Sequence, residues 1–127
     1  DKLENSILEY SAEREIPVLG ICRGMQSILH YENIPLVNVN KHANTRHKIY
    51  FVDQNKSLEV NSYHDFGALH SSIIDPINSL AYSLDNCSEY IQHQNYPWTG
   101  IMWHPEREKF LSDFDNKLIN QIFNSKK

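Results

Sequence analysis

The sequence predicts an α/β domain with a largely parallel central sheet. Two short apolar runs, residues 16–21 and 98–103, are rich in branched and aromatic side chains and are typical of strands buried on both faces. Helical patterns lie near both ends of the chain, with further strand patterns between them. Because this arrangement is typical of helices packed on a buried sheet, we expect a layered α/β fold.

The remaining elements follow from local patterns of apolar residues. Apolar residues recur at helical spacing in three segments, and alternating or β-branched runs mark five more strands. The expected helices span residues 3–14, 24–31 and 112–123, and the expected strands span residues 34–39, 48–52, 57–64, 79–84 and 89–94. The last two strands are expected to form an antiparallel pair around Asp85-Asn86.

Composition narrows the class of protein. A length of 127 residues predicts one domain over residues 1–127, and 40% hydrophobic with 22% charged residues is an ordinary globular balance. The net charge of -4 argues against a general nucleic-acid or anionic-membrane surface. With neither a bilayer-spanning apolar run nor a secretory pattern, a cytoplasmic location is the default expectation. Cys22 and Cys87 are then expected to be independent reduced thiols.

The stretch VLGICRGMQ places Cys22 between Gly20 and Gly24, where a predicted strand gives way to a helix. A helix N-terminus favours a thiolate, and flanking glycines permit the tight turn of a nucleophile elbow. We therefore expect Cys22 to be an activated nucleophile, with the Arg23 N–H facing the developing oxyanion. The alternative is a buried structural cysteine, which is how we interpret Cys87.

A second motif, GIMWHPER, supplies a base and its orienting group. His104 follows the second buried strand, and Glu106 stands two residues later across a rigid proline. Functional groups gather where strands of α/β sheets meet their C-terminal loops. We therefore expect Cys22 and His104 to meet at one sheet edge, with Glu106 orienting the imidazole.

The motifs GICRGMQ, VNSYH and GIMWHPER, in this order, resemble the class I glutamine amidotransferase-like family and particularly its γ-glutamyl hydrolase branch. The resemblance implies a flavodoxin-like, three-layer fold and a Cys-His-Glu triad of Cys22, His104 and Glu106. It also implies that a γ-glutamyl group is held partly by backbone atoms. The positions implied to bind substrate are Arg23, Gln26, Asn61, Ser62, Tyr63 and His64.

The implied reaction is hydrolysis of a γ-glutamyl amide through a cysteine thioester, with no cofactor. VNSYHDF, RHKIYF and GIMWHPERE are most similar to small bacterial members that cleave γ-glutamyl-CDP-amidate in capsule modification. Two alternatives remain open: a glutaminase that delivers ammonia to a synthetase partner, and an inactive remnant. Family members carry a further N-terminal segment with early strands and an oxyanion glycine turn, so we expect a partial domain or one completed by a second polypeptide.

Other residues have plainer interpretations. His42, His47, His64 and His70 match no compact metal-binding spacing, so no metal site is expected. The cations Lys41, Arg46 and Arg107 would suit a nucleotide diphosphate, although solvated surface charge is the simpler interpretation. Trp98 and Trp103 are expected to pack beside the last strand.

Overall fold

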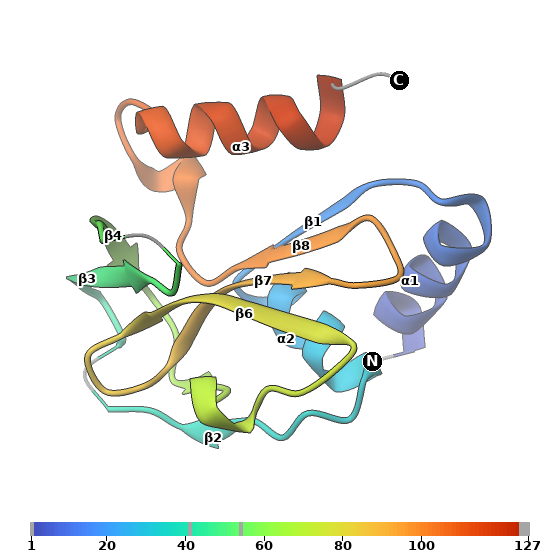
Figure 1. Cartoon of the computed structure of the whole chain (residues 1–127), viewed down its shortest axis with the longest axis horizontal. Coiled ribbons are helices and arrows are strands. Elements are labelled where there is room, and N and C mark those ends of the chain that lie inside the picture. Colours follow the sequence, from blue (N-terminus) through green and yellow to red (C-terminus); the bar gives the residue numbers. More distant parts are fainter. Residues whose placement is uncertain (1, 41, 54, 125–127) are drawn as a thin grey trace.

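The computed structural model describes residues 2–40, 42–53 and 55–124. Its centre is a six-stranded sheet in the order β1-β8-β7-β6-β3-β4 (Figure 1). The strands are β1 (Val18–Ile21), β3 (Thr45–Phe51), β4 (Ser57–Ser62), β6 (Ile77–Ser83), β7 (Ser88–His93) and β8 (Trp98–Ile101). A separate antiparallel pair contains β2 (Val37–Asn38) and β5 (Phe66–Gly67). The α/β class is thus confirmed, and each expected strand has a counterpart.

The expectation of a largely parallel sheet is wrong for the described residues. Only β1 and β8 pair in parallel, with Ile21 opposite Ile101, while the other pairs of the main sheet are antiparallel. The physical reason is the length of the connections. Short turns join β3 to β4 and join β6, β7 and β8 in succession, and a parallel pair needs a longer crossover. β1 and β8 lie far apart in the sequence and meet that requirement.

Helices cover both faces of the sheet (Figure 1). Helices α1 (Lys2–Arg14) and α2 (Arg23–Tyr31) contribute to one core cluster, and α3 (Asp113–Asn124) contributes to the other. The 3-10 turns η1 (His70–Ser72) and η2 (Pro105–Arg107) lie in connections. Neighbouring residues of β7 enter opposite clusters, Tyr90 with α3 and Ile91 with α1 and α2. The predicted three-layer arrangement is therefore present.

No helix in the described part of the chain has the length and apolar character needed to cross a lipid bilayer.

Close packing between β1 and α2 explains the first glycine of the GICRG motif. A Cβ added at Gly20 would lie 2.6 Å from the carbonyl carbon and 2.7 Å from the carbonyl oxygen of Gly24. These are backbone atoms, which cannot rotate away. A Cβ at Gly24 would meet nothing within 4 Å. The close contact with α2 therefore requires glycine at position 20, whereas no contact requires glycine at position 24.

This difference predicts opposite results for two matched substitutions. Gly20→Ala should lower the free energy of unfolding by about 1–3 kcal/mol, because the new methyl group forces β1 away from α2. Gly24→Ala should leave it unchanged or raise it by less than about 1 kcal/mol, since alanine favours a helix. Urea denaturation followed by circular dichroism measures both. Equal losses in the two variants would contradict the contact argument.

Candidate active site

The backbone holds Cys22 in a strained conformation at the junction between β1 and α2. Its φ is 55° and its ψ is -99°, a left-handed region that is uncommon for residues other than glycine. Its N–H donates to the carbonyl of Ile101 at 2.7 Å, and its carbonyl accepts from the N–H of Gln26 at 3.0 Å. Cys22 therefore ends the strand and begins the helix, as the motif predicted.

His104 and Glu106 form the predicted pair. Nδ1 of His104 lies 2.6 Å from Oε2 of Glu106, across the turn that Pro105 opens. Because β1 and β8 are parallel neighbours with Ile21 opposite Ile101, Cys22 and His104 leave the sheet from the same edge. This carboxylate contact leaves Nε2 as the imidazole nitrogen available for proton transfer.

Asn61 holds the backbone of His104. Its side-chain NH₂ donates to the His104 carbonyl at 2.9 Å and to Oε2 of Glu108 at 2.6 Å, while its Oδ1 accepts from the His104 N–H at 2.8 Å. Asn61 is 2% exposed. The resemblance placed it among substrate-binding positions, but its side chain is occupied by these bonds. Asn61 thus positions His104, and Glu108 is a site residue that sequence reasoning missed.

The expectation that the helix N-terminus lowers the pKa of Cys22 is wrong for this structure. Burial raises the pKa of the thiol, and the negative charges of Glu89 and Glu106 act in the same direction. The Arg23 N–H and the charge of Arg107 oppose them without reversing the result. The resting form is therefore the thiol, because desolvation outweighs the helix end. A base is needed to remove its proton.

Among the other residues predicted to bind substrate, Gln26 and Arg23 bond to other parts of the protein, whereas Tyr63 lies beside His104. Nε2 of Gln26 donates to the Phe66 carbonyl at 3.0 Å, and the exposed Arg23 side chain pairs with Glu4 at 3.0 Å. The Tyr63 ring lies beside the His104 ring, with centroids 5.9 Å apart. Arg107 lies over the same Tyr63 ring at 4.2 Å. These contacts place Tyr63 and Arg107 next to the imidazole.

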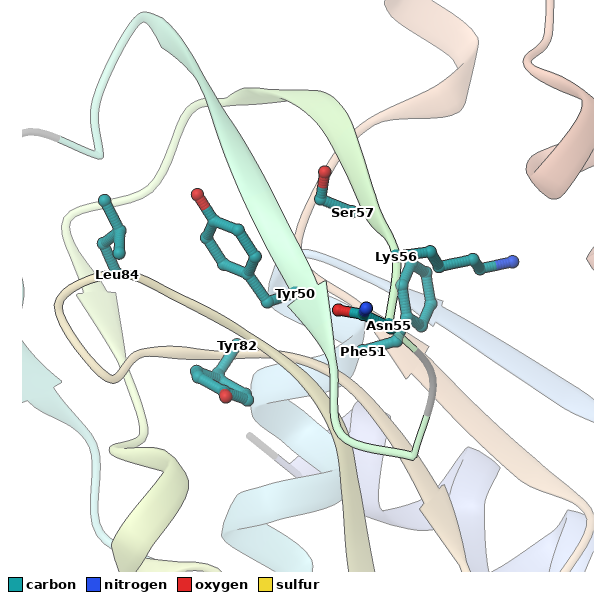
Figure 2. Close-up of a pocket in the computed structure, with 7 residues that line it drawn as sticks. All are labelled: Tyr50, Phe51, Asn55, Lys56, Ser57, Tyr82 and Leu84. Atoms are coloured by element: carbon teal, nitrogen blue, oxygen red, sulfur yellow. The ribbon is translucent and has the colours of Figure 1, made fainter.

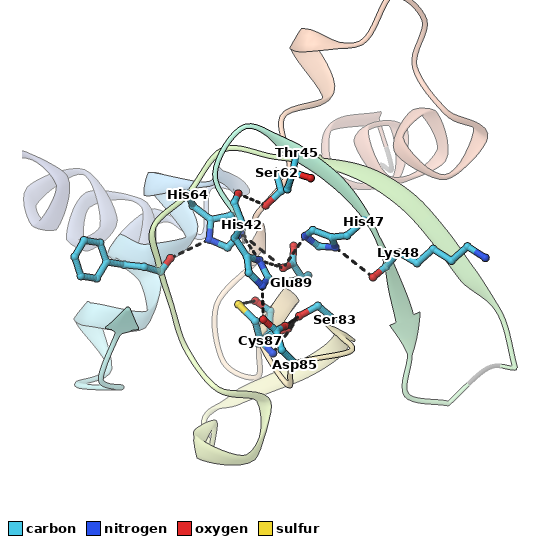
Figure 3. Close-up of polar contacts among 12 residues, drawn as sticks. His42, Thr45, His47, Lys48, Ser62, His64, Ser83, Asp85, Cys87 and Glu89 are labelled. Carbon is cyan, nitrogen blue, oxygen red and sulfur yellow. Dashed lines mark hydrogen bonds and ion pairs between the residues drawn. The ribbon is translucent and has the colours of Figure 1, made fainter. Parts of the chain in front are cut away.

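Ser62 and His64 point into the protein (Figure 3). Ser62 is fully buried and donates its hydroxyl proton to the carbonyl of His42. His64 is 4% exposed, and its Nδ1 lies 3.1 Å from the carbonyl of Phe66. Both side chains therefore stabilise the segment after β4. Contact between this segment and a substrate has to come from its main chain or from Tyr63.

Of the cations expected to face a nucleotide, Arg46 already has carboxylate partners. Arg46 pairs with Glu108 at 2.7 Å and lies 3.8 Å from Glu59, so its charge is already balanced. Lys41 lies outside the described residues. A hollow at the turn between β3 and β4 is lined by Tyr50, Phe51, Asn55, Lys56, Ser57, Tyr82 and Leu84 (Figure 2). None of the predicted site residues lines that hollow.

The protein-family model described as "Glutamine amidotransferase class-I" matches residues 2–125 of the chain. The chain belongs to the class I glutamine amidotransferase family. The resemblance drawn from GICRGMQ, VNSYH and GIMWHPER is therefore confirmed, together with the fold class.

Relatives within the glutamine amidotransferase family differ in their described activities. The chain is 34% identical over 113 residues to the γ-glutamyl-CDP-amidate hydrolase of Campylobacter jejuni, covering 89% of this chain and 54% of that protein. It is 26% identical over 130 residues to anthranilate synthase component 2 of Cyanophora paradoxa, covering 96% and 67%. A solved glutamine amidotransferase from Thermotoga maritima has a TM-score of 0.69 at 18% identity, over 97% of this chain and 53% of that structure. The chain thus spans about half the length of the first relative.

The two thiols of the chain should react differently. Cys22 is half-buried whereas Cys87 is fully buried, and burial raises the pKa of both. Iodoacetamide should therefore label Cys22 first, at a rate that still rises with pH above the ordinary thiol value of about 8.5, because the thiolate forms late. Mass spectrometry of digested protein measures both sites, with Cys22→Ala as the control. A rate that levels off below neutral pH would contradict the raised pKa.

Asn61→Asp tests the contacts that position His104. The new carboxylate loses the donors to the His104 carbonyl and to Glu108, and it lies next to the Glu108 carboxylate. We expect the free energy of unfolding to fall by about 1–3 kcal/mol. Asn116→Asp, an exposed position on α3, is the matched control and should change it by less than about 0.5 kcal/mol. Thermal and urea denaturation measure the stability of both variants. Equal losses in the free energy of unfolding would contradict the assignment.

Proposed function

We propose that this chain carries the catalytic set of a γ-glutamyl amide hydrolase, with Cys22 as nucleophile, His104 as general acid and base, and Glu106 as the group that orients His104. The observation that supports this most is the paired geometry at one sheet edge. A strained cysteine ends β1, and the His104–Glu106 pair follows β8, the parallel neighbour of β1. This is the arrangement of nucleophile, base and orienting group that acyl transfer requires.

The first half of the proposed reaction forms a thioester. His104 Nε2 accepts the Cys22 proton as the sulfur attacks the γ-carbonyl carbon, and Glu106 stabilises the resulting imidazolium through Nδ1–H. Because burial raises the pKa of Cys22, the thiol depends on His104 to take its proton. The Arg23 N–H donates to the developing oxyanion. His104 then protonates the departing nitrogen, and the C–N bond breaks.

The second half of the reaction regenerates the enzyme. His104, again neutral, accepts a proton from water as the water oxygen attacks the thioester carbon. The tetrahedral intermediate expels the Cys22 sulfur, which recovers a proton from His104, and glutamate is released. Every proton in this cycle passes through the nitrogen of His104 that does not face Glu106.

The substrate we favour is γ-glutamyl-CDP-amidate. The likeness to the Campylobacter jejuni hydrolase, at 34% identity over 89% of the chain, supports this choice. Arg107 lies over the Tyr63 ring, which is itself beside His104, and it would meet a phosphate-bearing leaving group. The second candidate is a glutaminase subunit that passes ammonia to a synthetase. The likeness to anthranilate synthase component 2 of Cyanophora paradoxa favours that alternative.

Substitution of the proposed triad tests the catalytic assignment. Glutamate release should fall about 10³-fold or more in Cys22→Ala and His104→Ala, and less in Glu106→Gln, since the orienting group acts through His104. His30→Gln, an exposed histidine of α2, is the control and should retain activity. Unchanged turnover in Cys22→Ala would rule out this nucleophile. An inactive wild-type chain would favour the remnant interpretation.

The choice of substrate is a separate measurement. Glutamate release is compared for γ-glutamyl-CDP-amidate, for simple γ-glutamyl amides and for glutamine, each with and without a candidate synthetase. We expect the nucleotide substrate to give the highest kcat/KM and to be independent of the synthetase. Arg107→Ala should then raise KM for the nucleotide substrate more than for glutamine. Turnover of glutamine that depends on the synthetase would instead establish the glutaminase role.

A further inference from the structure

A buried cluster of metal-binding side chains lies next to the segment after β4 (Figure 3). His42 precedes β3, His64 follows β4, Cys87 lies in the turn between β6 and β7, and Glu89 is in β7. Exposure is 3% for His42, 4% for His64, and 0% for Cys87 and Glu89. One potential ligand atom from each of the four lies within 4.8 Å of the others. Three stretches of chain, at His42, at His64 and at residues 87–89, thus converge on one point in the interior.

The carboxylate of Glu89 has no hydrogen-bond donor among the described residues. Neither oxygen has a hydrogen-bond partner, although ring nitrogens surround Oε2. Nδ1 of His42 lies 3.4 Å from this oxygen, Nε2 of His47 lies 3.5 Å away, and Nε2 of His64 lies 3.7 Å away. A fully buried carboxylate is costly unless a cation or several donors compensate it. The imidazole nitrogens around Glu89 Oε2 therefore lie 3.4–3.7 Å away, beyond the usual length of a hydrogen bond.

The outer nitrogens of the two fully enclosed imidazoles already have acceptors. Nε2 of His42 lies 2.8 Å from Oδ2 of Asp85, and Nδ1 of His64 lies 3.1 Å from the Phe66 carbonyl. Each contact requires an N–H on the outer nitrogen, so in a neutral ring the inner nitrogen presents a lone pair. Histidines that ligate metals commonly donate their second N–H to a carboxylate or carbonyl in this way. When both rings are neutral, two lone pairs and a carboxylate thus face one another.

We propose that His42 Nδ1, His64 Nε2, Glu89 Oε2 and Cys87 Sγ bind one divalent transition-metal ion of the zinc type. In a tetrahedral zinc site the ligand atoms stand about 3.3–3.6 Å apart, as follows from bonds of about 2.0–2.3 Å. His42 Nδ1 lies 3.3 Å from His64 Nε2, and the Glu89 oxygen lies 3.4 Å and 3.7 Å from these two nitrogens. Two of these three distances fall in that range and the third is slightly longer, so three of the ligand atoms are already close to tetrahedral spacing.

Charge and donor type support the same ion. Binding forms a metal–sulfur bond and releases the Cys87 thiol proton to solvent, which leaves one thiolate and one carboxylate. A divalent cation cancels both charges, so the buried site becomes neutral. Two imidazoles with a thiolate suit zinc rather than magnesium or calcium, which prefer oxygen ligands. Four protein ligands leave no open position, which is typical of a structural rather than a catalytic site.

The surroundings hold the proposed ligands in place. A Cβ at Gly67 would lie 2.7 Å from Cys87 Sγ, so glycine at this position leaves room for the sulfur. Ser83 Oγ accepts from the Cys87 N–H at 3.2 Å and also bonds Asp85, the residue that orients His42. A metal at this point would link the segments before β3 and after β4 to β7. The segment after β4 includes Tyr63, beside His104.

Metal content of the full chain is the first test. After purification with zinc supplied and removal of free metal, elemental analysis should find about one zinc per chain, as one tetrahedral site requires. Glu89→Gln and Cys87→Ser keep the side-chain size, and each should lose most of the bound zinc. The control His30→Gln should retain the zinc. Circular dichroism confirms that each variant folds. A folded wild-type chain without stoichiometric zinc would overturn the proposal.

Cobalt substitution tests the ligand set in the wild-type chain, independently of how the variants fold. Co²⁺ should give the intense visible bands of tetrahedral coordination and a near-ultraviolet thiolate-to-cobalt charge-transfer band. Cys87→Ser should abolish the charge-transfer band, and Cys22→Ser should keep it. A weak octahedral spectrum, or a charge-transfer band that survives in Cys87→Ser, would overturn the assignment.

Thermal stability gives a third readout. Removing zinc with a chelator should lower the Tm of the wild-type chain by about 5 °C or more, because metal binding is linked to folding. The same treatment should leave the Tm of Glu89→Gln unchanged. An identical response of the two proteins would contradict binding at Glu89. None of these measurements depends on γ-glutamyl hydrolase activity.

Discussion

The parallel pairing of β1 with β8 is the constraint on which the proposed site depends. The pairing aligns Ile21 with Ile101, and the hydrogen bond from the Cys22 N–H to the Ile101 carbonyl continues it past the end of β1. Parallel strands end at a common edge, so Cys22 and the His104 turn leave the sheet together. The strained φ of Cys22 is tolerated because this bond and the helix behind it fix the backbone on both sides.

The antiparallel half of the sheet supports the parallel half. From β4, Asn61 binds both the N–H and the carbonyl of His104 and so fixes the turn that follows β8. From β7, the Glu89 carbonyl accepts from the Met102 N–H at 3.0 Å, beside the same turn. The charge of Glu89 also acts on the Cys22 thiol. The buried polar cluster and the proposed triad are thus neighbours in one electrostatic environment, although they come from different strands.

Features that depend on short stretches of sequence were predicted well. The turn at Cys22 and the His104–Glu106 contact lie within a few residues, so the motif and the fixed φ of Pro105 were sufficient. Features that depend on solvation were not predicted well. The pKa of Cys22 was expected to fall at a helix end, yet it rises because side chains from elsewhere in the chain exclude water. Strand direction was also misjudged, since buried strands of either direction have similar apolar runs.

The sequence by itself therefore determined the family, the order of the elements and the identity of the proposed triad, because each is written in contiguous residues or in motif order. Only the tertiary structure decided that Asn61 binds His104 rather than facing outward, and that His42, His64, Cys87 and Glu89 meet. His42, His64 and the pair Cys87 and Glu89 are separated from one another by 20 or more residues, such as the 22 between His42 and His64, so their spacing matches no compact metal motif. Their convergence follows from the pairing of β3, β4, β6 and β7, which brings distant side chains into one buried volume.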